Sequence, residues 1–109
     1  MTNLLQETLE VLKSNGKSPE DVVWVGDREK KTTWSNFESI SNFQYDSGYG
    51  GNEIDGSLLV VGKDWWLERG EYDGSEWWEY KEHPSCESTG FTKLLNVRED
   101  WRSGLEWEK

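Results

Sequence analysis

The sequence lacks a second cysteine. Cys86 stands alone among 109 residues, so the chain cannot form an internal disulfide, and a reducing cytoplasm is its simplest compartment. The opening stretch, MTNLLQETLEVLKSNG, also lacks a basic segment followed by an apolar run. We therefore expect neither a signal peptide nor a membrane span at this end, and a cytoplasmic protein.

Hydrophobic residues are scarce, at 33% of the chain, whereas aromatic residues reach 14% and include eight tryptophans. Disordered chains are poor in aromatic residues, so a fold is expected. A chain of this length fits one domain. Its core must be built from a few large side chains, each of which buries on the order of 150–250 Å².

Basic residues are also few, with 12 Lys and Arg against 22 Asp and Glu and a net charge of −10. The basic clusters Arg28/Lys30/Lys31 and Arg98/Arg102 are interleaved with acids. Direct binding to nucleic acid or to an anionic membrane is disfavoured, because phosphates would be repelled. The acidity either serves solubility alone or marks a face directed at a basic partner.

Residues for catalysis and metal binding are sparse. His83 is the single histidine, and with Cys86 it supplies two ligands where structural zinc takes four. Asp46, Glu53 and Asp55 do not follow the order of a calcium loop. We predict no catalytic residues, no metal and no cofactor. Paired carboxylates for glycoside hydrolysis stay open as an alternative, because spacing in three dimensions is not visible in a sequence.

Two helices are expected in the first half of the chain. In the first, Asn3 is the N-cap, Gln6 occupies the capping-box position and Gly16 ends the helix, with a core stripe of Leu5, Leu9 and Leu12 widened by Leu4 and Val11. A helical turn over 18–21 and strands over 22–26 and 32–34 follow. The second helix, 35–43, begins at a capping box formed by Ser35 and Glu38.

A three-strand meander is predicted over residues 57–82. Asp73-Gly74 is typical of a type I′ hairpin turn, which places Tyr72 opposite Ser75 and Gly70 opposite Trp77. A tight turn at Gly62-Lys63 would place Val60 opposite Trp65. A final strand over 91–97 is also expected.

This register sorts the side chains onto two sides of the meander. One side is apolar and faces the core: Leu58, Val60, Trp65, Leu67, Trp78 and Tyr80. The other carries Leu59, Val61, Trp66, Tyr72 and Trp77 among acids. Either a helix covers this second side, or it is an exposed acidic and aromatic surface that binds a protein. In the latter case the candidate residues are Trp66, Glu68, Glu71, Tyr72, Glu76, Trp77 and Glu79.

Four segments together carry a resemblance: EDVVWVG (20–26), WSNFESI (34–40), YDSGYGGNEI (45–54) and LVVGKDWWLERGEYDGSEWWEYKEHP (59–84). The chain resembles small proteins encoded by phages and prophages of Gram-positive bacteria over roughly residues 5–84. The hairpin string is the most specific part. The resemblance implies a phage or mobile-element accessory role in the bacterial cytoplasm and brings no catalytic residues.

The sequence thus predicts an α+β fold in which an N-terminal helix and a short central helix pack on a mainly antiparallel sheet. Residues 1–97 would form one domain, and 98–109 a C-terminal tail, docked through Trp101 or partly disordered. The expected function is non-enzymatic: the chain, as a monomer, binds a host or phage protein. One form of this function would be mimicry of nucleic acid. The alternatives are a small carbohydrate-binding protein or hydrolase, and a virion structural or assembly component.

Overall fold

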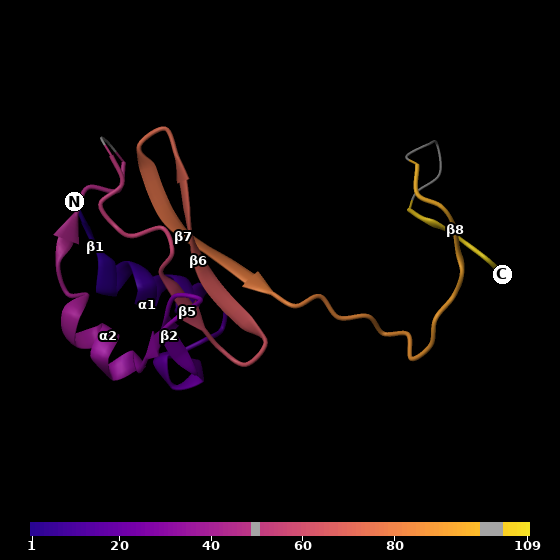
Figure 1. Cartoon of the computed structure of the whole chain (residues 1–109), viewed down its shortest axis with the longest axis horizontal. Helices are drawn as coiled ribbons and strands as arrows, with labels where there is room; N and C mark the ends of the chain where they lie inside the picture. The colour runs from indigo at the N-terminus through magenta and orange to yellow at the C-terminus, as the bar shows by residue number, and fades with distance from the viewer. Residues whose placement is uncertain (49–50, 99–103) are drawn as a thin grey trace.

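The computed structural model describes residues 1–48, 51–98 and 104–109 and has the α+β architecture that the sequence predicts (Figure 1). The elements in chain order are β1 (Thr2–Asn3), α1 (Leu4–Ser14), the 3₁₀ turn η1 (Pro19–Asp21), β2 (Trp24–Gly26), β3 (Lys31–Thr32), α2 (Trp34–Ile40), β4 (Gln44–Tyr45), β5 (Leu59–Val61), β6 (Trp65–Tyr72), β7 (Ser75–Glu82), β8 (Leu94–Asn96) and β9 (Glu106–Trp107). An antiparallel sheet in the order β3-β2-β5-β6-β7 forms the centre, and β1–β4 and β8–β9 are separate pairs.

Helix α1 begins at Asn3, whose side chain accepts the backbone N–H of Gln6 at 2.9 Å, as predicted. Of the predicted stripe, Leu12 and the flanking Leu4 are buried, whereas Leu5 and Leu9 are only half-buried and Thr8, which was not predicted, is buried between them. The difference arises because Thr8 faces the sheet. There its hydroxyl donates to the carbonyl of Leu4 and accepts the indole N–H of Trp78.

The β6–β7 hairpin has the predicted register. Asp73 and Gly74 adopt φ values of 50° and 88°, so both central residues of the turn are left-handed as a type I′ turn requires. Tyr72 pairs with Ser75 and Gly70 with Trp77. Two eight-residue strands thereby form the longest part of the sheet.

The β5–β6 turn is centred one residue later than predicted, between Lys63 and Asp64. Val61 pairs with Trp66 and Val60 with Leu67, and the N–H of Gly62 donates to the carbonyl of Trp65 at 2.9 Å. The predicted pairing of Val60 with Trp65 is therefore wrong by two residues. Because side chains alternate with a period of two, this shift leaves every residue on its predicted side.

Helix α2 begins two residues earlier than the predicted capping box requires. Thr33 is the N-cap, and its hydroxyl accepts the backbone N–H of Asn36 at 3.1 Å. Ser35 and Glu38 accordingly lie inside the helix and are exposed. Trp34, expected at the end of a strand, starts the helix instead and packs on Phe37.

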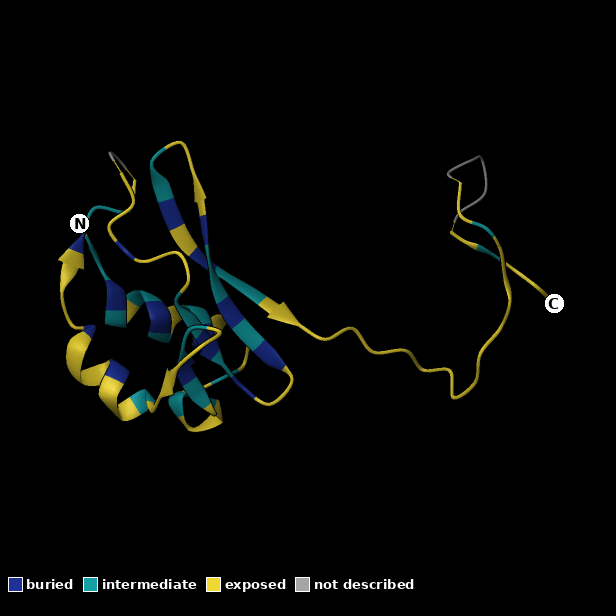
Figure 2. Cartoon of the chain, viewed as in Figure 1, coloured by how far each residue is buried: buried dark blue, intermediate teal, exposed yellow. Residues whose placement is uncertain are grey.

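The core lies between the helices and one side of the sheet (Figure 2). Its buried apolar residues are Leu4, Leu12, Val25, Phe37, Tyr45, Ile54, Val60, Trp65, Leu67 and Trp78, with Leu58 and Tyr80 packed against them. All six apolar residues assigned to the core side of the meander are therefore part of this core or in contact with it.

After β7 the chain runs away from the sheet as an extended and mostly exposed segment that leads to β8 and β9 (Figures 1 and 2). The predicted final strand exists as β8, but it pairs with β9 and not with the central sheet. Trp101, the predicted docking residue, lies outside the described residues. Of the helices described, none combines the length and apolar character needed to cross a membrane.

Candidate functional site

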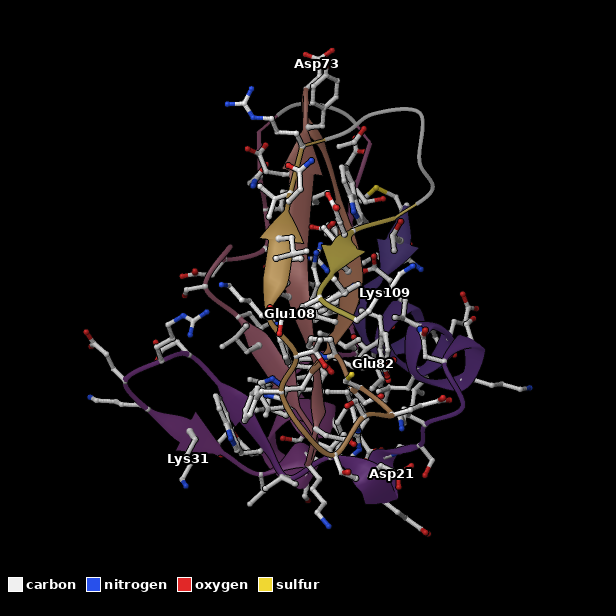
Figure 3. All side chains as sticks on the ribbon, turned by 90° about the vertical axis from the view of Figure 1, so that its right-hand side faces the viewer. Asp21, Lys31, Asp73, Glu82, Glu108 and Lys109 are labelled. Carbon is white, nitrogen blue, oxygen red and sulfur yellow. The ribbon has the colours of Figure 1, made fainter. Side chains whose placement is uncertain are left out.

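The side of the sheet that faces away from the helices is called here the open face. The cross-strand pairs Trp24–Val61, Val61–Trp66 and Trp66–Lys81 define one end of it. Glu68–Glu79 and Gly70–Trp77 lead to the other end, at the tip of the β6–β7 hairpin. In Figure 3, Asp73 at that tip lies at the top of the view and Lys31 in β3 at the lower left.

The hairpin end of the open face combines aromatic rings with carboxylates, and we call it the acidic-aromatic end: Glu68, Tyr72, Trp77 and Glu79. Tyr72 is 76% exposed and Trp77 38%. A Cβ at Gly70 would lie 2.8 Å from Nε1 of Trp77 and 2.6 Å from Oε1 of Glu79, so both side chains lie across this glycine. Glu68 accepts a hydrogen bond of 2.7 Å from Nε1 of Trp66.

Glu71 and Glu76 do not belong to this surface. They pair with each other across the hairpin on the helix side of the sheet, one position out of step with Tyr72 and Trp77. Glu76 is 3% exposed, whereas Glu71 is exposed. Five of the seven candidate residues therefore share one face, and the assignment of Glu71 and Glu76 is corrected because of the alternation of the pleat.

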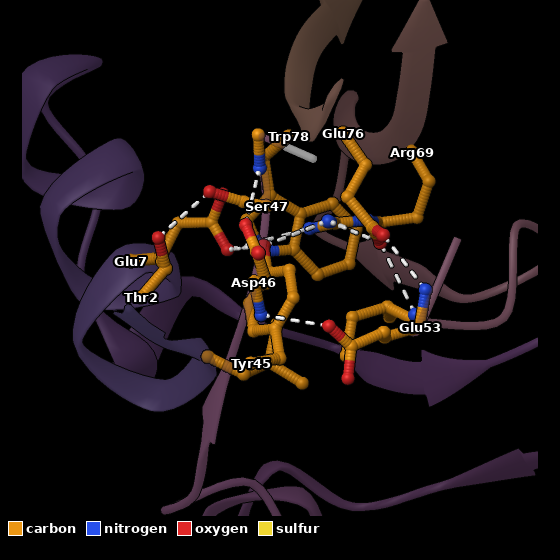
Figure 4. Close-up of polar contacts among 12 residues, drawn as sticks. Thr2, Glu7, Tyr45, Asp46, Ser47, Glu53, Arg69, Glu76 and Trp78 are labelled. Atoms are coloured by element: carbon orange, nitrogen blue, oxygen red, sulfur yellow. Dashed lines mark hydrogen bonds and ion pairs between the residues drawn. The ribbon is translucent and has the colours of Figure 1, made fainter. Parts of the chain in front are cut away.

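Glu76 instead belongs to a buried polar network centred on Arg69 (Figure 4). Nη2 of Arg69 donates to Oε1 of Glu76 at 3.2 Å and to the hydroxyl of Tyr45 at 2.9 Å. The Glu76 carboxylate also accepts the backbone N–H groups of Glu53, at 2.8 Å, and Ile54, at 3.1 Å. These bonds satisfy a buried charge and hold the 51–58 loop against the hairpin.

The network continues to α1 through Tyr45. Its hydroxyl donates a 2.5 Å hydrogen bond to Glu7, and the Arg69 guanidinium lies 4.7 Å from the ring of Trp78. Burial, together with the hydrogen bond to Glu7, raises the pKa of Tyr45 to about 12. A sequence signal for this network existed, since Arg69 and Glu76 both fall at positions that the register assigns to the core side.

The opposite end of the open face contains a groove of about 550 Å³, which sequence reasoning missed. We call it the Trp24–Trp66 groove. Its apolar walls are Trp24, Leu59, Val61 and Trp66, and the ring of His83 lies 5.3 Å from that of Trp66. The sequence signal was the alternation of Trp24 with the buried Val25 in the VVWVG run.

The β2–β3 loop, residues 27–30, and Lys31 at the start of β3 border this groove. Arg28, Lys30 and Lys31 are exposed there. Asp27 turns back on the loop: its Oδ1 accepts the backbone N–H groups of Glu29 and Lys30, both at 2.8 Å. The N–H donors of Lys30 and Glu29 lower the pKa of Asp27 below its ordinary value. The open face thus has at one end a mixed border, in which three cations outnumber Asp27 and Glu29, and at the other end acids.

The described part of the chain contains no grouping of side chains suited to nucleophilic catalysis or to metal binding. Cys86 is exposed, and the His83 ring packs against Trp66. No cluster of three or more His, Cys, Asp or Glu side chains there could hold a metal ion. Glu53, one of the three acids compared with a calcium loop, accepts the backbone N–H of Asp46 at 2.8 Å. Its carboxylate thus joins the two ends of the 46–53 segment.

Comparison with known proteins gives no match to this chain, whether to a family model, a curated protein or a solved structure.

Proposed function

We propose that this chain is a non-enzymatic accessory protein of a phage or prophage that binds a host or phage protein through the acidic-aromatic end of its open face. The observation that carries the proposal is the exposure of Tyr72 and Trp77 beside Glu68 and Glu79 on the β6–β7 hairpin. Tyrosine and tryptophan are enriched among the residues that contribute most to protein–protein binding.

The negative charge of the acidic-aromatic end favours a partner with a basic surface. Glu68 and Glu79 are direct cross-strand neighbours, and like charges so placed destabilise a sheet slightly. A basic surface would relieve that repulsion on binding. The net charge of −10 would also accelerate the encounter with a basic partner. In its most specific form, the acidic end would occupy a basic nucleic-acid-binding site of a host enzyme.

The test is a pull-down from bacterial lysate followed by affinity measurement with the purified partner. Trp77→Ala is expected to weaken binding by at least ~2 kcal/mol, or about 30-fold in Kd, if this ring is a central contact. Glu68→Lys combined with Glu79→Lys is expected to slow association and to reduce its dependence on salt.

The matched control is Glu20→Lys combined with Glu38→Lys, which makes the same change of charge at exposed positions in η1 and α2. Binding that survives the Glu68/Glu79 variant and Trp77→Ala would exclude this surface. A saturable change of Trp fluorescence with a panel of glycans would instead support the carbohydrate-binding alternative.

A further inference from the structure

The Trp24–Trp66 groove leaves apolar surface uncovered. Three apolar residues of neighbouring strands, Trp24, Val61 and Trp66, line it side by side, and all are partly exposed. Its volume of about 550 Å³ falls within the range of sites that bind ligands or peptide segments. An apolar face of this kind rimmed by charges is typical of an interaction site.

The C-terminal hairpin β8–β9 also has exposed apolar side chains that no second layer covers. Leu94 pairs with Trp107, so their side chains lie on the same side of the hairpin, and they are 39% and 50% exposed. An isolated two-stranded hairpin is at best marginally stable in water, because it has no second layer to cover its apolar residues. A surface that receives Leu94 and Trp107 would supply this layer.

The chain connects the two surfaces directly. His83 forms part of the groove, and its backbone N–H donates to the carbonyl of Asp64 at 3.1 Å, which holds the start of the segment there. Ten residues, 84–93, separate His83 from Leu94. Fully extended they span about 35 Å, and as a flexible linker they average ~18 Å, so the hairpin can return to the groove.

Charge favours this end of the open face over the other. Trp107 is followed by Glu108, and along the border of the groove the cations Arg28, Lys30 and Lys31 outnumber the acids Asp27 and Glu29. At the acidic-aromatic end, the same carboxylate would meet Glu68 and Glu79. Attachment through a short linker gives the hairpin an effective concentration of roughly millimolar order, whereas a second copy carries a net charge of −10 and is repelled.

We propose that hairpin β8–β9 folds back onto the Trp24–Trp66 groove of its own chain and covers it with Leu94 and Trp107. The hairpin lies away from the sheet in the structure (Figure 1), so the docked arrangement is a second state of the same molecule. In that state the groove is closed to other ligands, while the acidic-aromatic end stays accessible.

The test uses the full chain with Cys86→Ser and Lys109→Cys, which moves the single thiol to the end of the hairpin for a nitroxide label. The indole N–H signals of ¹⁵N-labelled tryptophans report proximity to the label. Docking predicts that the Trp24 and Trp66 signals lose most of their intensity relative to the reduced label. The Trp78 signal, from the helix side of the sheet, loses much less. Equal intensities at Trp24 and Trp66 with oxidised and reduced label would overturn the proposal.

Isotope dilution separates the same chain from a second copy. A ¹⁵N-labelled chain without nitroxide is mixed with an unenriched chain that carries it. Docking within one chain predicts no loss of the Trp24 and Trp66 signals in this mixture. Loss in the mixture would show exchange of hairpins between copies and would overturn docking within the chain.

Variants identify the contacts. Trp107→Ala is expected to restore the Trp24 and Trp66 signals, whereas Phe91→Ala, which removes an exposed ring upstream of β8, leaves them broadened. Lys31→Glu is expected to restore part of the intensity, and Lys13→Glu, the same charge change on α1, to have no effect. Broadening that persists in Trp107→Ala would contradict the assigned contact.

Discussion

Nε1 of Trp78 donates a 2.8 Å hydrogen bond to the hydroxyl of Thr8, which in turn donates to the carbonyl of Leu4 at 2.7 Å. This bond connects the β6–β7 hairpin to the first helix across 70 positions of the chain. It also distinguishes the two rings of the second Trp-Trp pair, because Trp78 is 5% exposed with its N–H satisfied while Trp77 stays on the open face.

Thr8→Val is expected to destabilise the protein by about 1–3 kcal/mol, because it keeps the shape of the side chain and leaves the buried indole N–H of Trp78 without an acceptor. Urea unfolding measures this difference. Thr8→Ser retains the hydroxyl and should lose only about 0.8 kcal/mol for the missing methyl group. Equal losses in the two variants would show that the hydrogen bond contributes little.

Arg69→Met is expected to lower the free energy of unfolding by about 3–5 kcal/mol, because it leaves the Glu76 carboxylate buried without its cation. The Arg69 and Glu76 side chains are only 3% and 1% exposed, so solvent cannot compensate. Combining Arg69→Met with Glu76→Gln should cost less than the sum of the single variants by roughly 0.5–3 kcal/mol. Additive losses would contradict a coupled pair.

Alkaline pH is expected to destabilise the protein through Tyr45. Burial, followed by the hydrogen bond to Glu7, raises its pKa from 10.0 to about 12 in the folded chain. A folded pKa above the unfolded pKa means that this contribution to stability is complete below pH 10 and is lost as the pH rises from 10 to about 12. The free energy of unfolding, measured across this range, should fall more steeply with pH for the wild type than for Tyr45→Phe. Parallel curves would contradict the raised pKa.

Gly62→Ala is expected to destabilise the protein by about 1–3 kcal/mol, because a Cβ there would lie 2.1 Å from the indole ring of the buried Trp65. Trp65 stacks on Tyr80 with a centroid distance of 5.9 Å, which limits its retreat. Gly56→Ala is the control, since a Cβ at that position meets nothing within 4 Å. Thermal unfolding compares the two, and similar melting temperatures would show that the β5–β6 turn can rearrange.

The predictable part of the fold depended on short-range rules. Positive φ at Asp73 and Gly74 follows from the residue types, and the sides of the meander follow from alternation. The errors came from choices between near-equal local solutions, such as Thr33 against Ser35 as the N-cap of α2 and Lys63-Asp64 against Gly62-Lys63 as the centre of the β5–β6 turn. The second error did not change the predicted side of any residue of the meander, because side chains alternate and the register shifted by two residues.

The candidate surface was predicted only in part. Trp66, Tyr72 and Trp77 were assigned to one side by register, and they lie there. Glu71 and Glu76 were included among its acids, yet they are strand neighbours of Tyr72 and Trp77 and therefore face the opposite side. The groove at Trp24 was missed because β2 joins the meander through β5, a pairing of distant segments that no local pattern specifies.

The sequence by itself determined the helices, the hairpin turn and the two-sided distribution of tryptophans, because each depends on backbone conformations and periodicities within a few residues. Only the tertiary structure decided that Arg69, Glu76 and Tyr45 meet in the core, and that the helices cover one side of the sheet and leave the other open. These outcomes depend on contacts between segments tens of residues apart. Their energies arise only when the whole chain is packed.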